Sequence, residues 1–157
     1  MRRFLGVLAL VLVLVVGYGA YATLTEPGHL YKAAGVFGGC PPRPSCVSSQ
    51  VASDEAAYVA PLGPASIAAM ARAIESLGGD IRTSQPDYLH AVFVTPTMRY
   101  RDDLEVLRDG SGWQVRSISR FGYRDFGVNA QRVESLRSAL AAEAADAPSA
   151  RPEPAGR

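Results

Sequence analysis

Residues 99–137, RYRDDLEVLRDGSGWQVRSISRFGYRDFGVNAQRVESLR, decide the fold that we expect for this chain. Residues 100–107 alternate between two sets with a period of two, which is typical of a strand. The DGSG stretch at 109–112 is typical of a tight turn before a second strand at 113–120. The pattern therefore predicts a β-hairpin followed by a polar, glycine-bearing turn into a helix.

The turn also predicts which residues share a face of the sheet. A two-residue loop at 109–110 or at 110–111 pairs even-numbered positions of the first strand with odd-numbered positions of the second. Asp102 then lies beside Ser117 and Ser119 on a largely apolar face. The apolar members of this face are Tyr100, Leu104, Val106, Trp113 and Val115. Because an unpaired buried carboxylate is costly, we expect Asp102 to be hydrogen-bonded to a serine or to a backbone N–H; alternatively, these three residues form a small polar pocket.

The opposite face of the hairpin carries charges of both signs. Asp103 and Glu105 lie there with Arg116 and Arg120, and Ile118 lies between the two arginines. We interpret the four charged residues as a cross-strand ladder on a solvated face. Each ion pair of such a ladder contributes up to about 1 kcal/mol.

The turn after the hairpin supplies a second candidate for function. It places Arg120, Arg124 and Arg132 around the start of a helix, where exposed N–H groups favour a bound carboxylate or phosphate. In the alternative interpretation Asp125 or Asn129 caps this helix, and Arg132 pairs with Asp125. The candidate ligand-binding residues are Asp102, Ser117, Ser119, Arg120, Arg124, Asp125, Asn129 and Arg132.

The rest of the chain predicts an α+β fold in a single small domain. Apolar residues recur at helical spacing over 64–77, with Gly63 and Pro64 at the entry and two glycines after the last turn. A second helix is expected at 129–144, with Asn129 as a candidate N-cap, and further strands at 80–84 and 88–94. We expect an antiparallel sheet of about four strands with both helices packed on one face.

An apolar N-terminal segment precedes this domain. Arg2 and Arg3 are followed by residues 4–24, which are long enough to span a bilayer as a helix. We expect an uncleaved transmembrane anchor at 1–24, with the domain on the periplasmic or extracytoplasmic side. The alternative is a signal peptide, because Ala20-Tyr21-Ala22 satisfies a small-x-small cleavage rule and its removal would release the protein to the periplasm.

The other boundaries follow from composition. Residues 25–39 read as a glycine-bearing linker in which Tyr31 and Phe37 could dock on the domain. The globular domain is expected at 40–145, and the Pro- and Ala-rich tail at 146–157 is expected to be disordered.

Cys40 and Cys46 are the two cysteines of the chain. Delivery across a membrane favours a Cys40–Cys46 disulfide, which would contribute on the order of 2 kcal/mol in the chain-entropy model. The alternative is a redox pair, although the spacing is not C-x-x-C. No spacing links these cysteines to His29 or His90 as a metal site would require, so we expect no metal and no cofactor.

Three motifs carry a resemblance to a known family. They are CPPRPSCVSS at 40–49, DDLE at 102–105 and R-S-I-S-R-x-G-Y-x-D-F-G-V-N-x-x-R-V-E-x-L-R at 116–137. Over residues 40–140 the chain resembles domain-of-unknown-function family 1499, which occurs in bacteria and plastids. The resemblance implies no reaction, cofactor or partner. This chain has Ser45, Tyr58 and Arg124 where the resemblance leads us to expect Asn, His and a small residue.

Charge and motifs narrow the function classes. The formal net charge is +1, and the chain has no nucleotide-binding glycine fingerprint, so nothing favours nucleic acid or nucleotide chemistry. We expect a membrane-tethered, non-catalytic module that binds a small anionic ligand or an envelope protein. The alternative is a hydrolase that uses Asp102 or Asp125 with a nearby serine, but no Ser, Cys or His stands in a recognisable nucleophile motif.

Overall fold

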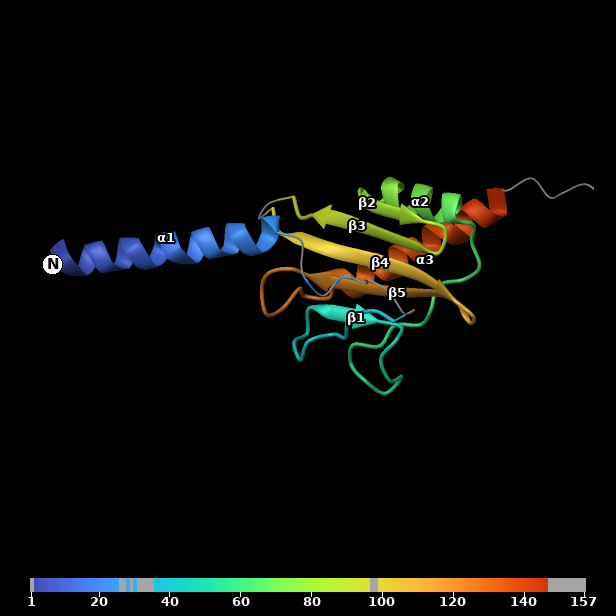
Figure 1. Cartoon of the computed structure of the whole chain (residues 1–157), viewed down its shortest axis with the longest axis horizontal. Helices are drawn as coiled ribbons and strands as arrows, with labels where there is room; N and C mark the ends of the chain where they lie inside the picture. Colours follow the sequence, from blue (N-terminus) through green and yellow to red (C-terminus); the bar gives the residue numbers. More distant parts are fainter. Residues whose placement is uncertain (1, 26–27, 29, 31–35, 97–98, 147–157) are drawn as a thin grey trace, which may run out of the picture.

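A computed structural model describes residues 2–25, 28, 30, 36–96 and 99–146 of the chain. Its five strands form one antiparallel sheet in the order β1-β5-β4-β3-β2, with α2 and α3 behind it (Figure 1). The elements are α1 (Arg2–Leu24), β1 (Cys46–Ser48), α2 (Ile67–Ser76), β2 (Asp80–Gln85), β3 (Tyr88–Val94), β4 (Arg101–Asp109), β5 (Gly112–Ser119) and α3 (Val128–Asp146). The predicted α+β class, with two helices on one face of the sheet, is confirmed.

The hydrophobic core lies between the sheet and the two helices. Met70 and Ile74 of α2 and Leu136 of α3 pack against Leu104 and Val115 of the central strands, and all five are buried. The core residues of the helices are spaced three or four positions apart, and those of β4 and β5 are spaced two positions apart. One apolar stripe on each helix therefore meets one apolar face of the sheet.

The ends of two helices differ slightly from the prediction. Ser66, and not Gly63-Pro64, begins α2, because the Ser66 hydroxyl accepts a hydrogen bond from Ala69 N at 3.1 Å. Helix α3 begins at Val128, so Asn129 lies inside the first turn.

The predicted hairpin register is confirmed. Asp109 pairs with Gly112 around a two-residue loop, and Val106 pairs with Val115 further along, so odd positions oppose even ones as expected. Gly112 adopts a φ of +129°, in the left-handed region that glycine tolerates best.

The sheet has one strand more than the sequence predicts. Strand β1 spans three residues and pairs with β5, with Val47 opposite Ser117. A strand this short has no readable period in the sequence, and it forms beside the Cys40–Cys46 disulfide, whose Cα atoms are 5.6 Å apart. The disulfide prediction is confirmed, and the bridge holds the start of β1 at the sheet edge.

The sheet face opposite the helices is also covered. Phe37, which the predicted linker includes, packs against Tyr88 and Leu107 as a second buried cluster. Its backbone N–H donates to the side chain of Gln50 at 2.8 Å. The predicted docking of Phe37 is therefore confirmed, whereas Tyr31 lies outside the described residues.

Helix α1 extends away from the domain (Figure 1). Its window Phe4–Tyr21 has a mean hydropathy of 2.4 and none of it is buried inside the protein. This is the one helix among the described residues that is long and apolar enough to cross a membrane, and a signal sequence would pass the same test. Residues 26–27, 29 and 31–35 of the predicted linker and 147–157 of the predicted tail lie outside the described residues.

Candidate ligand-binding site

Asn129 is the centre of a buried polar cluster between α3 and β5. Its Nδ2 donates to Asp125 Oδ2 at 2.7 Å, to Ser119 Oγ at 3.0 Å and to the Ser45 backbone oxygen at 3.1 Å. Both Asn129 and Ser119 are buried. This amide therefore joins β5, the loop before α3 and the residue before β1.

The amide oxygen of Asn129 extends the cluster to the predicted face residues. It accepts hydrogen bonds from Ser117 Oγ and from Arg132 Nη1, each at 2.6 Å. Arg132 Nη2 also donates to Asp102 Oδ2 at 2.6 Å, and its guanidinium stacks 4.6 Å from the Phe93 ring centroid. Asp102 is therefore paired, as the cost of burying a lone carboxylate requires. Its partner is an arginine of α3 and not a serine or a backbone group.

Asp125 caps α3. Its carboxylate accepts from Gly127 N at 3.0 Å and from Asn129 N at 2.9 Å, so it satisfies two of the N–H groups that begin the helix. Asn129 is not the N-cap, which corrects one of the two predicted alternatives. The pairing of Arg132 with Asp125 is also wrong, because Arg132 bonds Asp102. The carboxylate of Asp125 occupies the position where an external anion was expected.

The structure separates the three arginines that were expected to share this site. Arg120 lies on the opposite face of the sheet, where it binds Asp103 and donates to Thr25 O at 2.8 Å. Arg132 is engaged in the cluster described above. Arg124 is exposed at the rim of a cavity and has no hydrogen bond or ion pair to any described residue.

This cavity lies at the end of the sheet where the β3–β4 connection meets the β5–α3 loop. Its volume is about 450 Å³, within the range of small-molecule sites. Most of its wall is apolar, and the rings of Tyr100 and Phe121 lie 5.4 Å apart in it. The lining residues are Thr95, Pro96, Tyr100, Asp102, Ser119, Phe121, Gly122, Arg124, Asp125, Phe126 and Val128. Four of the predicted candidates, Asp102, Ser119, Arg124 and Asp125, thus line one cavity.

The charged groups of the cavity wall differ in their partners. Asp102 is paired with Arg132, and Asp125 accepts three hydrogen bonds from Gly127 and Asn129. Asp102 thus has a cationic partner, whereas Asp125 keeps its negative charge and is held by neutral N–H donors. Arg124 is the one cation among the residues that line the cavity, and its N–H groups have no acceptor among the described residues, so the cavity combines an apolar body with free cationic donors at its rim.

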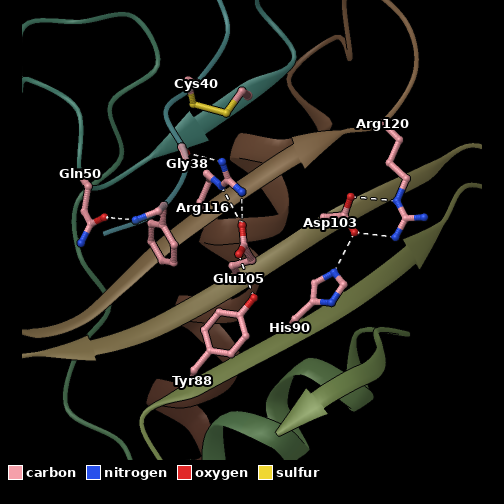
Figure 2. Close-up of polar contacts among 11 residues, drawn as sticks. Gly38, Cys40, Gln50, Tyr88, His90, Asp103, Glu105, Arg116 and Arg120 are labelled. Atoms are coloured by element: carbon pink, nitrogen blue, oxygen red, sulfur yellow. Dashed lines mark hydrogen bonds and ion pairs between the residues drawn. A yellow bond between two sulfur atoms is a disulfide. The ribbon is translucent and has the colours of Figure 1, made fainter. Parts of the chain in front are cut away.

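The opposite face of the sheet holds a second set of charges, shown in Figure 2. Glu105 and Arg116 face each other on β4 and β5, and their side chains are 0% exposed. Arg116 Nε donates to Glu105 Oε2 at 2.8 Å, Tyr88 donates to Glu105 Oε1 at 2.8 Å, and Arg116 also bonds the Gly38 carbonyl. The predicted cross-strand pairing of charges is therefore present, but the prediction that this face is solvated is wrong, because the paired side chains are buried.

Asp103 receives hydrogen bonds from two sides on this face. Arg120 donates to both of its oxygens at 2.8 and 2.9 Å, and His90 Nε2 lies 2.8 Å from Oδ1 (Figure 2). Burial by itself would raise the pKa of the Asp103 carboxyl, but the hydrogen bonds from His90 and Arg120 outweigh it and hold this pKa below its ordinary value. Burial and the neighbouring Glu105 raise the pKa of Tyr88, so its hydroxyl stays a donor.

Sequence reasoning missed the apolar half of the cavity. Phe121, Phe126, Val128 and Pro96 were not among the predicted site residues. A signal was present in FGYRDFG at 121–127, where three aromatic residues stand in a short polar turn between strand and helix. Aromatic residues in such a turn have no core to fill, which favours a binding role.

Within the described ranges, no three His, Cys, Asp or Glu side chains gather as a metal site would require. The comparison with family models matches residues 37–140 to the family described as "Protein of unknown function (DUF1499)". No curated protein matches the sequence.

Proposed function

The chain belongs to the DUF1499 family, and we propose that this member is a membrane-tethered, non-catalytic module that binds a small amphipathic anion. The observation that carries the proposal is the cavity under the β5–α3 loop, with its apolar wall and the guanidinium of Arg124, whose donors have no acceptor among the described residues. In this proposal α1 remains as the anchor, and the domain lies on the extracytoplasmic side, where its disulfide is stable.

The ligand class follows from the cavity wall. Tyr100, Phe121 and Val128 offer apolar surface to a hydrocarbon or ring, and Arg124 offers a planar guanidinium that suits a carboxylate or phosphate. Asp102 is paired with Arg132, and Asp125 accepts three hydrogen bonds, so both would repel the head of such a ligand less strongly than free carboxylates would.

The contacts of the two serines support a non-catalytic role. Ser117 Oγ donates to the amide oxygen of Asn129, and Ser119 Oγ accepts from its Nδ2. An amide cannot take a proton from a serine, and among the described residues neither hydroxyl bonds a carboxylate or an imidazole. A hydrolase mechanism would need such a base beside its nucleophile.

The proposal is tested by thermal unfolding of the full-length protein in detergent micelles. Decyl phosphate should raise the melting temperature, because a ligand that binds only the folded state stabilises it by RT ln(1 + [L]/Kd). Decanol and inorganic phosphate, which each carry half of the required chemistry, should raise it less. Arg124→Ala should reduce the decyl phosphate shift and Arg124→Lys should restore part of it. Arg82→Ala, at an exposed arginine paired with Asp80, is the matched control.

Equal melting-temperature shifts with decyl phosphate in Arg124→Ala and Arg82→Ala would show that Arg124 does not bind the anion. If decyl phosphate raises the melting temperature of the parent protein no more than decanol does, the proposed function is contradicted.

A further inference from the structure

The position of the cavity relative to α1 points to the source of its ligand. Gly19 of α1 lies against Phe121: a Cβ atom at Gly19 would be 3.6 Å from Phe121 Cζ. Arg120, the preceding residue, donates from Nη1 to Thr25 O at 2.8 Å, just beyond the end of α1. Two neighbouring residues at the start of the β5–α3 loop thus hold the C-terminal end of the anchor helix.

This contact fixes the height of the loop above the membrane. Gly19 falls within the apolar window Phe4–Tyr21, two residues from its end. At about 1.5 Å per residue, Gly19 is roughly 3 Å inside that end of the window. When the window spans the bilayer, Phe121 therefore lies at the level of the lipid–water interface.

The loop exposes further aromatic residues. Phe126 is 93% exposed and Tyr123 is 66% exposed, and both belong to the loop that carries Phe121. Phe126 also adopts a φ of +54°, a conformation that disfavours an aromatic residue, so neither core packing nor backbone preference accounts for phenylalanine at this position. Tyr18 and Tyr21 of α1 are exposed beside the same end of the domain. Exposed aromatic rings near a helix end suit the interfacial region of a bilayer.

We infer that the β5–α3 loop rests on the bilayer surface and that the cavity behind it takes an anionic membrane lipid directly from that bilayer. This inference rests on the proposed function, which it deepens by assigning the ligand to the membrane that α1 enters. Phe126 and Tyr123 enter the interface, Arg124 between them binds the anionic headgroup, and an acyl chain lies against Tyr100 and Phe121. The lipid does not have to cross water to reach this site.

The orientation is tested with a fluorophore on single cysteines in the full chain, placed in nanodiscs of phosphatidylcholine and phosphatidylglycerol. Tyr123→Cys labels the loop, and Ser111→Cys labels the β4–β5 turn at the other end of β5 as the matched control. Cys40 and Cys46 are bridged and do not react. Headgroup spin-labelled lipid should quench the label at 123 several-fold more than the label at 111. Equal quenching at the two positions would overturn the inference.

The lipid itself is tested with phosphatidylglycerol that carries a photoreactive group on its acyl chain. Cross-links should map to the walls of the cavity, and Val128→Trp, which adds bulk at the rim, should reduce them several-fold. Decyl phosphate is titrated into the same preparation in detergent. If decyl phosphate binds while no lipid cross-links in the cavity, the inference fails and the proposed function stands. If neither binds, both fail.

Discussion

Glu105 and Arg116 lie directly opposite each other on β4 and β5, and neither side chain is exposed to solvent. Tyr88 donates a further hydrogen bond to Glu105, and the Gly38 carbonyl accepts one from Arg116, so each member of the pair has a second partner. Removing one partner of a buried pair leaves an uncompensated charge, which costs about 3–5 kcal/mol. The pair therefore makes the second sheet face sensitive to single substitutions.

The first prediction concerns this pair. Arg116→Met should lower the free energy of unfolding by about 3–5 kcal/mol, because Glu105 would remain buried without its arginine. The double variant Glu105→Leu with Arg116→Met should be more stable than Arg116→Met alone, since no charge is left unpaired. Urea unfolding of the full chain in micelles, followed by the fluorescence of Trp113, measures both. A loss below about 1 kcal/mol in the single variant is the behaviour of a surface pair and would contradict the account.

The second prediction concerns acid stability. The folded state holds the pKa of Asp103 below its unfolded value of about 3.9, so between the two values the unfolded chain binds more protons. The stability from Asp103 is therefore fully present above about pH 4 and is lost as the pH falls through the folded pKa. Asp103→Asn should be less stable at neutral pH, because Arg120 loses its carboxylate partner, and the unfolding free energy of this variant should fall less steeply below pH 4 than that of the parent. Parallel slopes in the two proteins would show that Asp103 is not the group responsible.

The third prediction compares two buried serines. Ser117 Oγ bonds Asn129, whereas Ser45 Oγ is buried without a hydrogen-bond partner among the described residues. Ser117→Ala should cost about 1–3 kcal/mol by leaving buried polar groups of the cluster unsatisfied, and Ser45→Ala should be neutral or slightly stabilising. Thermal or urea unfolding of both variants gives the comparison. A larger loss of unfolding free energy in Ser45→Ala than in Ser117→Ala would contradict the assignment of Ser117, and not Ser45, to the hydrogen-bonded cluster.

The fourth prediction concerns membrane topology. With Arg2 and Arg3 on the inner side and α1 as the anchor, an alkaline phosphatase reporter fused to the C-terminus of the full chain should be active. The fusion should also remain in the membrane fraction after a carbonate wash. Release into the soluble periplasmic fraction would show that α1 is a cleaved signal peptide. Activity of a cytoplasm-only reporter at the same place would reverse the orientation.

Much of the fold could be predicted from local patterns. The alternation at 100–107, the DGSG turn and the helical spacing at 64–77 predict the hairpin and the helix-covered face, because each pattern is complete within one segment. The buried setting of Glu105 and Arg116 could not be predicted in this way. The segment with Phe37 and Gly38 that packs beside them is far away in sequence, and no periodicity shows where it packs.

The candidate site was predicted in part for a similar reason. Arg124 and Asp125 come from the turn that the sequence singles out, but their separation from Arg120 depends on the path of the β5–α3 loop, because Arg120 binds Asp103 on the opposite face of the sheet. The frequency of asparagine at helix starts predicts Asn129 as a cap, whereas tertiary contacts with Ser119 and Ser45 bury it inside the first turn. The cavity itself needs Tyr100 and Phe121 from different connections, which local patterns do not bring together.

A native mass spectrum of the full chain, purified from membranes in mild detergent, tests whether the cavity holds an anionic lipid. We expect a fraction of the protein to carry an added mass that matches an anionic lipid, and we expect this fraction to be lost in both Val128→Trp and Arg124→Ala. Arg82→Ala should keep it. A spectrum in which the parent shows the mass of the bare chain alone, or in which Val128→Trp retains the adduct as fully as the parent, would contradict the claim.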